Sequence, residues 1–192
     1  MKKSVDKWVE ESGENILKHI GIKKGQKVLD FGCGSGNYTI PAARVVGEQA
    51  SVYALDEDKE ALDRLINKAK LKGLKNIVGL DASGKLGIAL DNESVDVVLL
   101  YDILHYYYFP EENDRRRLLC EVYRVLKPYG LLSVYPTHLE SDMELKMDSV
   151  VREIEESNFH KENEYTNMIM VHDDNIEEGC VINFRKKSAI AI

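Results

Sequence analysis

The chain has 192 residues and a formal net charge of -7. This length can bury one full hydrophobic core but leaves little room for a second, so residues 1–192 are predicted to form a single domain. The acidic balance argues against a nucleic-acid partner, because phosphate binding normally requires a basic face.

The cysteines and the N-terminus indicate a compartment. Cys33, Cys120 and Cys180 are odd in number, widely spaced and without metal-ligand spacing, which favours a reducing compartment over a disulfide framework. The first ten residues lack the apolar core of a secretion signal, and no run approaches the ~20 apolar residues of a membrane span. We expect a cytoplasmic protein without a membrane partner, while its oligomeric state stays open.

The first predicted elements are helical. Residues 4–20 carry apolar side chains at helical spacing, Ser12-Gly13 interrupts the pattern and Gly21 ends it, which predicts two short helices. Trp8 lies in the first of them, where an aromatic side chain commonly anchors a helix to its neighbours.

A glycine-rich turn follows the first predicted strand. Residues 28–31 form the short apolar run of a strand buried on both faces, and residues 32–36 have glycine at every second position. Asn37 can cap the next helix, predicted over residues 39–46. Strand, glycine turn and helix N-terminus in this order form the nucleotide site of doubly wound α/β folds.

The glycine spacing distinguishes between cofactors. The pattern is D-x-G-x-G-x-G starting at Asp30, whereas the dinucleotide fingerprint G-x-G-x-x-G would need its third glycine at Asn37. A carboxylate at this strand end would repel a pyrophosphate by about 4 kcal/mol at about 4 Å and an effective dielectric near 20. S-adenosylmethionine carries an ammonium and a sulfonium and no phosphate. The stretch resembles motif I of the class I S-adenosylmethionine-dependent methyltransferases.

Two further predicted strands end on acids. Residues 51–55 precede Asp56, which in a βαβ nucleotide unit can accept hydrogen bonds from both ribose hydroxyls. Alternatively, Asp56 caps the next helix, predicted over residues 57–72. Residues 76–80 form a third strand that precedes Asp81.

The resemblance assigns further roles. It implies that Asp81 hydrogen-bonds the adenine amino group beside the backbone of Ala82, although an acid before Ala-Ser-Gly is also typical of a turn. It also implies that residues 1–22 form a helical lid that includes Trp8. The predicted cofactor-binding residues are Asp30, Gly32, Cys33, Gly34, Gly36, Asp56, Glu57, Asp81, Ala82 and Tyr101.

An aromatic segment follows the most apolar strand. After a loop over residues 83–92, residues 95–100 are predicted to form the central strand, and residues 101–110 contain four tyrosines, one phenylalanine and one histidine. This segment leaves the strand where a substrate would meet the methyl group. His105 is the best-placed candidate for a general base, with packing among the aromatic side chains as the alternative.

A second motif of the family lies about a hundred residues after the first. Residues 115–127 are predicted to be a helix whose three arginines, 115–117, form a solvated face. The run R-V-L-K-P-Y-G from Arg124 resembles the family's R-V-L-K-P-G-G turn from helix to strand and departs from it at Tyr129. Residues 131–135 form the fifth strand.

The C-terminal part completes the predicted fold. One more amphipathic helix carries Met143, Met147, Val150, Val151 and Ile154. Residues 159–172 and 180–186 form two strands joined by a turn over residues 173–179, and residues 188–192 form a tail. The predicted fold class is α/β, a doubly wound, mostly parallel Rossmann-like sheet of about seven strands with a C-terminal antiparallel hairpin.

The resemblance implies an enzyme that transfers a methyl group from S-adenosylmethionine to a small-molecule acceptor. Because a sulfonium is already a good leaving group, alignment suffices, and the five histidines show no zinc-like spacing, so no metal ligands are predicted. The alternatives are a non-catalytic S-adenosylmethionine-binding subunit and a dinucleotide-dependent oxidoreductase, which Asp30 disfavours. The acceptor site is predicted between Trp8, residues 101–109 and residues 135–138, with a mostly apolar or aromatic acceptor.

Overall fold

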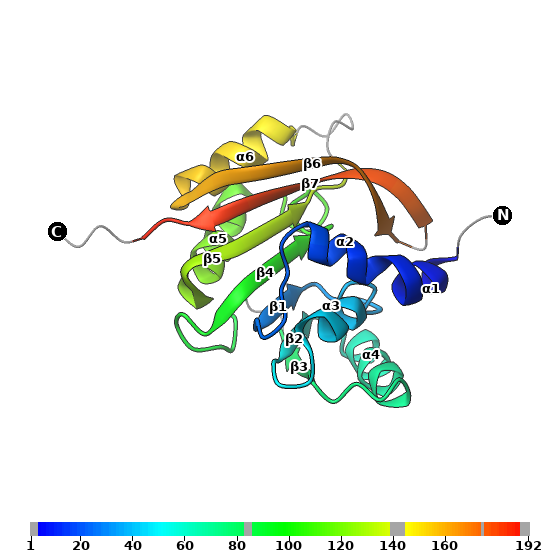
Figure 1. Ribbon diagram of the computed structural model, residues 1–192. Helices are drawn as coiled ribbons and strands as arrows, with labels where there is room; N and C mark the ends of the chain where they lie inside the picture. The colour runs from blue at the N-terminus through cyan, green and yellow to red at the C-terminus, as the bar shows by residue number, and fades with distance from the viewer. Residues whose placement is uncertain (1–3, 83–85, 139–144, 174, 189–192) are drawn as a thin grey trace.

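The computed structural model describes residues 4–82, 86–138, 145–173 and 175–188, which are built around a seven-stranded sheet (Figure 1). The strands are β1 (Val28–Phe31), β2 (Val52–Asp56), β3 (Ile77–Asp81), β4 (Val95–Tyr101), β5 (Leu126–Tyr135), β6 (Phe159–His172) and β7 (Asn175–Lys186). Their order is β3-β2-β1-β4-β5-β7-β6. The first five strands pair in parallel, and β7 inserts antiparallel between β5 and β6.

Helices cover both faces of this sheet (Figure 1). One face carries α1 (Val5–Lys7), the π-helical turn η1 (Trp8–Ser12), α2 (Gly13–His19), α3 (Thr39–Val46) and α4 (Lys59–Leu71). The other face carries α5 (Glu112–Val125) and α6 (Met147–Glu156). Among the described residues, no helix combines the length and apolar character needed to cross a membrane.

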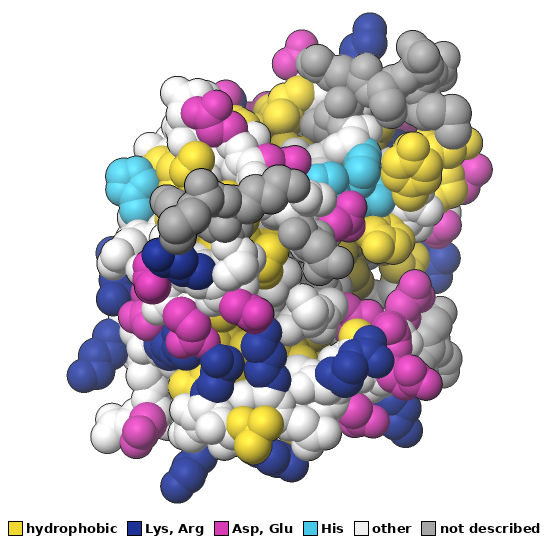
Figure 2. Space-filling model, turned by 90° about the vertical axis from the view of Figure 1, so that its right-hand side faces the viewer, with side chains coloured by type: hydrophobic (Ala, Val, Ile, Leu, Met, Phe, Trp, Pro, Cys, Tyr) yellow, Lys and Arg dark blue, Asp and Glu magenta, His cyan; other side chains and the backbone are white. Residues whose placement is uncertain are grey.

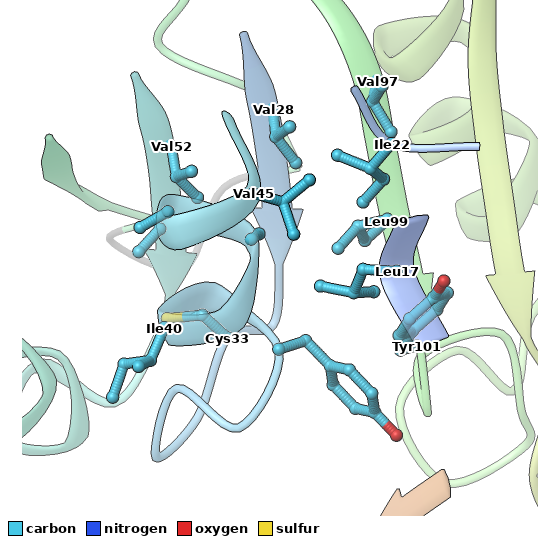
Figure 3. Close-up of a cluster of buried hydrophobic side chains, with 14 of the residues drawn as sticks. Leu17, Ile22, Val28, Cys33, Ile40, Val45, Val52, Val97, Leu99 and Tyr101 are labelled. Carbon is cyan, nitrogen blue, oxygen red and sulfur yellow. The ribbon is translucent and has the colours of Figure 1, made fainter. Parts of the chain in front are cut away.

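Two hydrophobic cores follow from the alternation of side chains along the strands. Val28 of β1 and Leu99 of β4 face α2 and α3, and Figure 3 shows Val28 near Val45 and Leu99 near Leu17. Leu29 and Leu100, each one position further along, face α5 and α6. A strand that is buried on both faces has a continuous run of apolar residues, which is why these strands could be predicted from the sequence.

The fold prediction is confirmed. The sheet is mostly parallel, β4 is its central strand, and β6 and β7 form the C-terminal antiparallel hairpin. The hairpin is longer than predicted, because β7 begins at Asn175 rather than at Cys180. Its first residues, including Glu177 and Glu178, are exposed, so they lack the apolar pattern by which a buried strand is recognised.

Two helices have other caps than those that the sequence suggested as possible, Asn37 and, as the alternative role, Asp56. Asp58 rather than Asp56 caps α4, because its carboxylate accepts the backbone N–H groups of Glu60 and Ala61 at 2.9 and 3.1 Å. The N-cap of α3 is Tyr38, without a side-chain capping bond, rather than Asn37. Asp56 therefore remains available to the glycine turn.

At the predicted interruption, Ser12-Gly13, η1 ends and α2 begins, but the chain stays helical through the boundary. Gly13 serves close packing: a Cβ atom at this position would lie 2.7 Å from Cγ of Pro41 in α3. The predicted helix position Met143 and most of the predicted tail fall on residues 139–144 and 189–192, outside the described residues.

Candidate active site

A hollow of about 500 Å³ opens at the carboxyl edge of the sheet. The glycine turn after β1 and the end of β2 form one side of it, and the segment after β4 forms the other. The two sides meet where β1 and β4 lie next to each other and their following connections lead to opposite faces of the sheet. This is the crevice in which open α/β sheets bind their ligands.

The backbone of the glycine turn excludes side chains at two positions. Gly32 and Gly36 have φ values of +74° and +81°, a region that favours glycine. A Cβ atom at Gly32 would lie 2.1 Å from Cδ1 of Ile103, and one at Gly36 would lie 2.1 Å from Cδ1 of Leu65. The spacing of these glycines thus reflects both the turn and the neighbours packed beneath it.

Asp56 connects the end of β2 to the glycine turn. One carboxylate oxygen accepts the N–H of Gly34 at 2.7 Å, and the other accepts the N–H of Asp58 at 2.9 Å. Asp56, Gly34 and Asp58 all line the hollow, as does Glu57. The sequence thus predicted Asp56 and Glu57 at this wall, and the structure adds Asp58.

Asp30 lies beneath the glycine turn and is not part of the wall of the hollow. Its carboxylate is buried and accepts the hydroxyl hydrogen of Thr39 at 2.5 Å. Burial raises the pKa of Asp30 to about 6, because it disfavours the charged form more than the bond from Thr39 stabilises it. When it is ionised, Asp30 therefore places a negative charge near the hollow without being part of its wall.

The remaining predicted cofactor residues mostly reach the wall. Cys33, Ala82 and Tyr101 line the hollow, and burial raises the pKa of the Cys33 thiol far above its ordinary value, which removes it as a nucleophile. Tyr101 packs edge-on against Tyr38, with ring centroids 4.7 Å apart. The side chain of Asp81 lies outside what the structure describes.

The acceptor half of the edge begins at Asp102, which lines the hollow directly after β4. Its φ of +58° is uncommon for a residue with a side chain. Burial favours the neutral carboxyl, but hydrogen bonds from His105 and Thr137 and the charge of His172 together hold the pKa of Asp102 below its ordinary value. Asp102 is therefore a fixed anion at this wall.

His105 is buried and does not line the hollow. Its Nδ1 accepts the N–H of Tyr107 at 3.2 Å, so the ring proton sits on Nε2, which lies 3.2 Å from the carbonyl oxygen of Asp102 and 3.4 Å from its carboxylate. Both nitrogens are engaged with the protein. This geometry favours the packing role over that of a general base.

Sequence reasoning missed a cluster around Asp102. The Nε2 atoms of His138 and His172 lie 2.9 Å apart, at 3.9 and 3.6 Å from Oδ1 of Asp102. Asp102 follows β4, His138 follows β5 and His172 is the last residue of β6. Their spacing in the chain therefore does not indicate that they lie together. The antiparallel insertion of β7 is what brings the end of β6 to this edge.

A buried ion pair holds the far end of the aromatic segment. Arg115 donates to both carboxylate oxygens of Glu153 at 2.8 Å, and its third nitrogen donates to the carbonyls of Phe109 and Pro110 at 2.7 and 3.0 Å. The prediction of a solvated arginine face is therefore wrong for Arg115, although Arg116 and Arg117 are exposed. The sequence of three adjacent arginines does not indicate which side chain is buried.

Two residues predicted near the acceptor lie outside the wall of the hollow. Trp8 is buried, donates to the carbonyl of Ile169 at 2.6 Å and packs edge-on against Tyr38, so it anchors the N-terminal helices to β6. Tyr135 is buried and donates to Glu177 at 2.8 Å. The aromatic segment itself does reach the hollow, through Tyr108 and Phe109.

The fold and this crevice define a class I, Rossmann-like methyltransferase architecture. Residues 29–134 match the protein family described as "Methyltransferase domain", and the chain belongs to this family. The matched stretch runs from β1 to the end of β5, so it contains the glycine turn, Asp56 and Asp102 but not the C-terminal hairpin.

Similar proteins extend this result. A demethylmenaquinone methyltransferase of Lactobacillus johnsonii is 28% identical over 134 residues, 70% of this chain and 53% of that protein. Another, from a Geobacillus species, is 33% identical over 117 residues, 61% of this chain and 47% of that protein. The chain spans about half the length of these curated relatives. A solved structure, a SAM (S-adenosylmethionine)-dependent methyltransferase from Aquifex aeolicus, is similar with a TM-score of 0.75 and 23% sequence identity. The similarity covers 95% of this chain and 94% of that chain.

Proposed function

We propose that this protein transfers the methyl group of S-adenosylmethionine to a small-molecule acceptor. The observation that carries the proposal is the composition of the hollow: a glycine turn with Asp56 lies at one end, and apolar and aromatic side chains around Asp102 lie at the other. Its volume of about 500 Å³ falls within the about 300–1,000 Å³ of pockets for small ligands.

The residues at the first end fit this cofactor. Asp56 presents a carboxylate where ribose hydroxyls can donate to it, and Ala82 lies beside it at the wall. Asp30, set below the turn, favours a cation over a phosphate in the hollow. We assign ribose binding to Asp56, with Glu57 beside it, and adenine binding to Asp81 and Ala82.

Methyl transfer from a sulfonium requires mainly that the cofactor and the acceptor are aligned. The cofactor supplies an electrophilic methyl group on a sulfonium. Tyr101, held by its hydroxyl contact with Ser133 at 2.9 Å, and Ile103 both line the hollow, and these side chains would help to keep water from the reacting groups. Fixing two reactants in line can contribute up to about 7–11 kcal/mol. His105 then serves to orient Asp102 rather than to take a proton from the acceptor.

The acceptor end favours an apolar or aromatic compound. Phe31, Ile103, Tyr108, Phe109 and Val171 line the hollow, and Ile103, Tyr108 and Phe109 belong to the segment after β4. The relatives named as demethylmenaquinone methyltransferases act on a quinone, which supports an acceptor of this kind. In Figure 2, basic and acidic side chains are interspersed over the visible face, which supports a small acceptor over a nucleic acid. Three free cysteines support a cytoplasmic location.

The test combines binding with turnover. Isothermal titration should show binding of S-adenosylmethionine and S-adenosylhomocysteine and none of NAD. Incubation with methyl-labelled cofactor and a pool of small apolar metabolites should then yield a labelled product. Binding without any product would support the non-catalytic subunit instead, and tight NAD binding without a response to S-adenosylmethionine would overturn the proposal.

A further inference from the structure

Three atoms of the kind that bind metals converge at the acceptor end of the hollow: Oδ1 of Asp102 and the Nε2 atoms of His138 and His172. Each comes from a different strand end, and all three lie within 4.8 Å of one another. We propose that these residues bind a divalent transition-metal ion. Neither the family match, which ends at residue 134, nor the sequence spacing points to this site.

The separations suit a bound ion. The three atoms lie 2.9, 3.6 and 3.9 Å apart. A point equidistant from three atoms at these separations is about 2.0 Å from each, which matches the lengths of Zn–N and Zn–O bonds, about 2.0 to 2.2 Å. The 2.9 Å contact between the two Nε2 atoms is a hydrogen bond, and an ion bound by both atoms would take the place of its hydrogen.

The surroundings of His172 orient it as a ligand. Its Nδ1 lies 3.1 Å from Oε1 of Glu177, and the hydroxyl of Tyr135 donates to the same oxygen at 2.8 Å. With the Nδ1 proton directed to Glu177, Nε2 keeps its lone pair for an ion. A carboxylate behind a histidine is the arrangement that fixes ring orientation and raises basicity at metal sites.

The ligand types select the class of ion. Imidazole nitrogen suits zinc, iron, nickel and copper, whereas magnesium and calcium take mainly oxygen ligands. Two histidines and one carboxylate leave at least one coordination position open, as in catalytic zinc sites and in non-haem iron sites. The side chain of His138 is about one-third exposed (36%), so an ion can enter from solvent.

The position relative to the hollow gives the ion a use. Asp102 and Asp173 both line the hollow, and Asp173 lies 3.9 Å from Nε2 of His172. Histidine side chains appear beside acidic and hydrophobic ones at the surface in Figure 2. An open coordination position would bind an oxygen of the acceptor and lower the pKa of its hydroxyl, so that its proton passes to solvent water. The oxygen would then form a bond to the methyl carbon as the carbon–sulfur bond of the sulfonium breaks, a role that rests on the proposed methyl transfer. The acceptor would then carry a hydroxyl or a similar ionisable oxygen.

The experiment measures metal binding directly. Purified protein is freed of metal with a chelator, and Zn²⁺ is titrated in by calorimetry while Co²⁺ is followed by its visible absorption. The wild type should bind one ion, and His138→Ala and His172→Ala should each weaken binding by at least about 100-fold. Glu177→Gln should weaken it by about 10- to 100-fold. The matched control, His160→Ala, removes an exposed histidine from the opposite end of β6 and should bind like the wild type.

S-adenosylmethionine titration of the same metal-free samples separates the two proposals and reports on folding. If the cofactor binds but Zn²⁺ does not, or if His138→Ala binds Zn²⁺ like the wild type, the metal site is overturned and the methyltransferase proposal stands. If Zn²⁺ binds as expected and the cofactor does not, the metal site stands and the methyltransferase proposal fails.

Discussion

The two halves of the carboxyl edge are built by different means. The cofactor half consists of backbone geometry and short-range contacts: the glycine turn follows β1 directly, and Asp56 follows within one βαβ unit. The acceptor half consists of side chains from β4, β5 and β6, which the inserted strand β7 brings together. A half built from consecutive residues can be read from sequence, whereas a half assembled from distant strands cannot.

The largest effect should come from the ion pair that supports the acceptor half. Arg115→Ala leaves Glu153 buried without a partner and frees the carbonyls of Phe109 and Pro110. The free energy of unfolding should fall by about 3–5 kcal/mol, measured by urea denaturation. Arg116→Ala, which removes an exposed partner of Glu112, should change it by less than about 1 kcal/mol. Equal losses in both variants would contradict the anchoring role.

The second effect concerns the charge beneath the cofactor half. The folded protein holds the Asp30 proton more tightly than the unfolded chain does, since the pKa is about 6 in the fold and 3.8 ordinarily. The contribution of Asp30 to stability is therefore greatest below about pH 4 and declines by about 3 kcal/mol as the pH rises through about 6. Asp30→Asn should remove this decline in urea denaturation across that range.

The cofactor gives an independent readout of the same group. Because ionised Asp30 attracts a cation, the affinity for S-adenosylmethionine should weaken as the pH falls through about 6 in the wild type. In Asp30→Asn the affinity should be lower and independent of pH over this range. A pH-dependence that persists in Asp30→Asn would assign it to another group.

The third effect separates binding from capping within the cofactor half. Asp56→Ala should weaken S-adenosylmethionine binding by about 1.5–3 kcal/mol, because ribose hydroxyls lose a charged acceptor. Asp58→Ala removes the cap of α4 and should lower the free energy of unfolding by about 0.5–2 kcal/mol with little change in affinity. Calorimetry and thermal denaturation of both variants give the comparison, and unchanged affinity in Asp56→Ala would remove its cofactor role.

The smallest effect is expected at His105. Because both of its ring nitrogens are bonded within the protein, His105→Gln should lower turnover by less than about tenfold, with the pH profile of kcat unchanged. Loss of a general base would instead lower turnover by about 10²- to 10⁴-fold. A loss of that size with intact cofactor affinity, measured once an acceptor is found, would restore His105 as the base.

The sequence by itself determined the fold class and most of the cofactor half. Residues 28–36 encode a buried strand and a turn whose φ values only glycine adopts readily, and both signals depend on adjacent residues. Even here the tertiary structure set the details: α4 begins at Lys59, so Asp58 caps it, and the carboxylate of Asp56 accepts the N–H groups of Gly34 and Asp58.

Only the tertiary structure decided the acceptor half. His138 and His172 are strand-end residues whose meeting with Asp102 depends on the order of β4, β5, β7 and β6 in the sheet. Likewise, the inward turn of Arg115 depends on Glu153 of α6, a partner that no local pattern reveals. Local sequence fixes backbone conformation through sterics and periodicity, but the side chains that share a site are chosen by how distant elements pack.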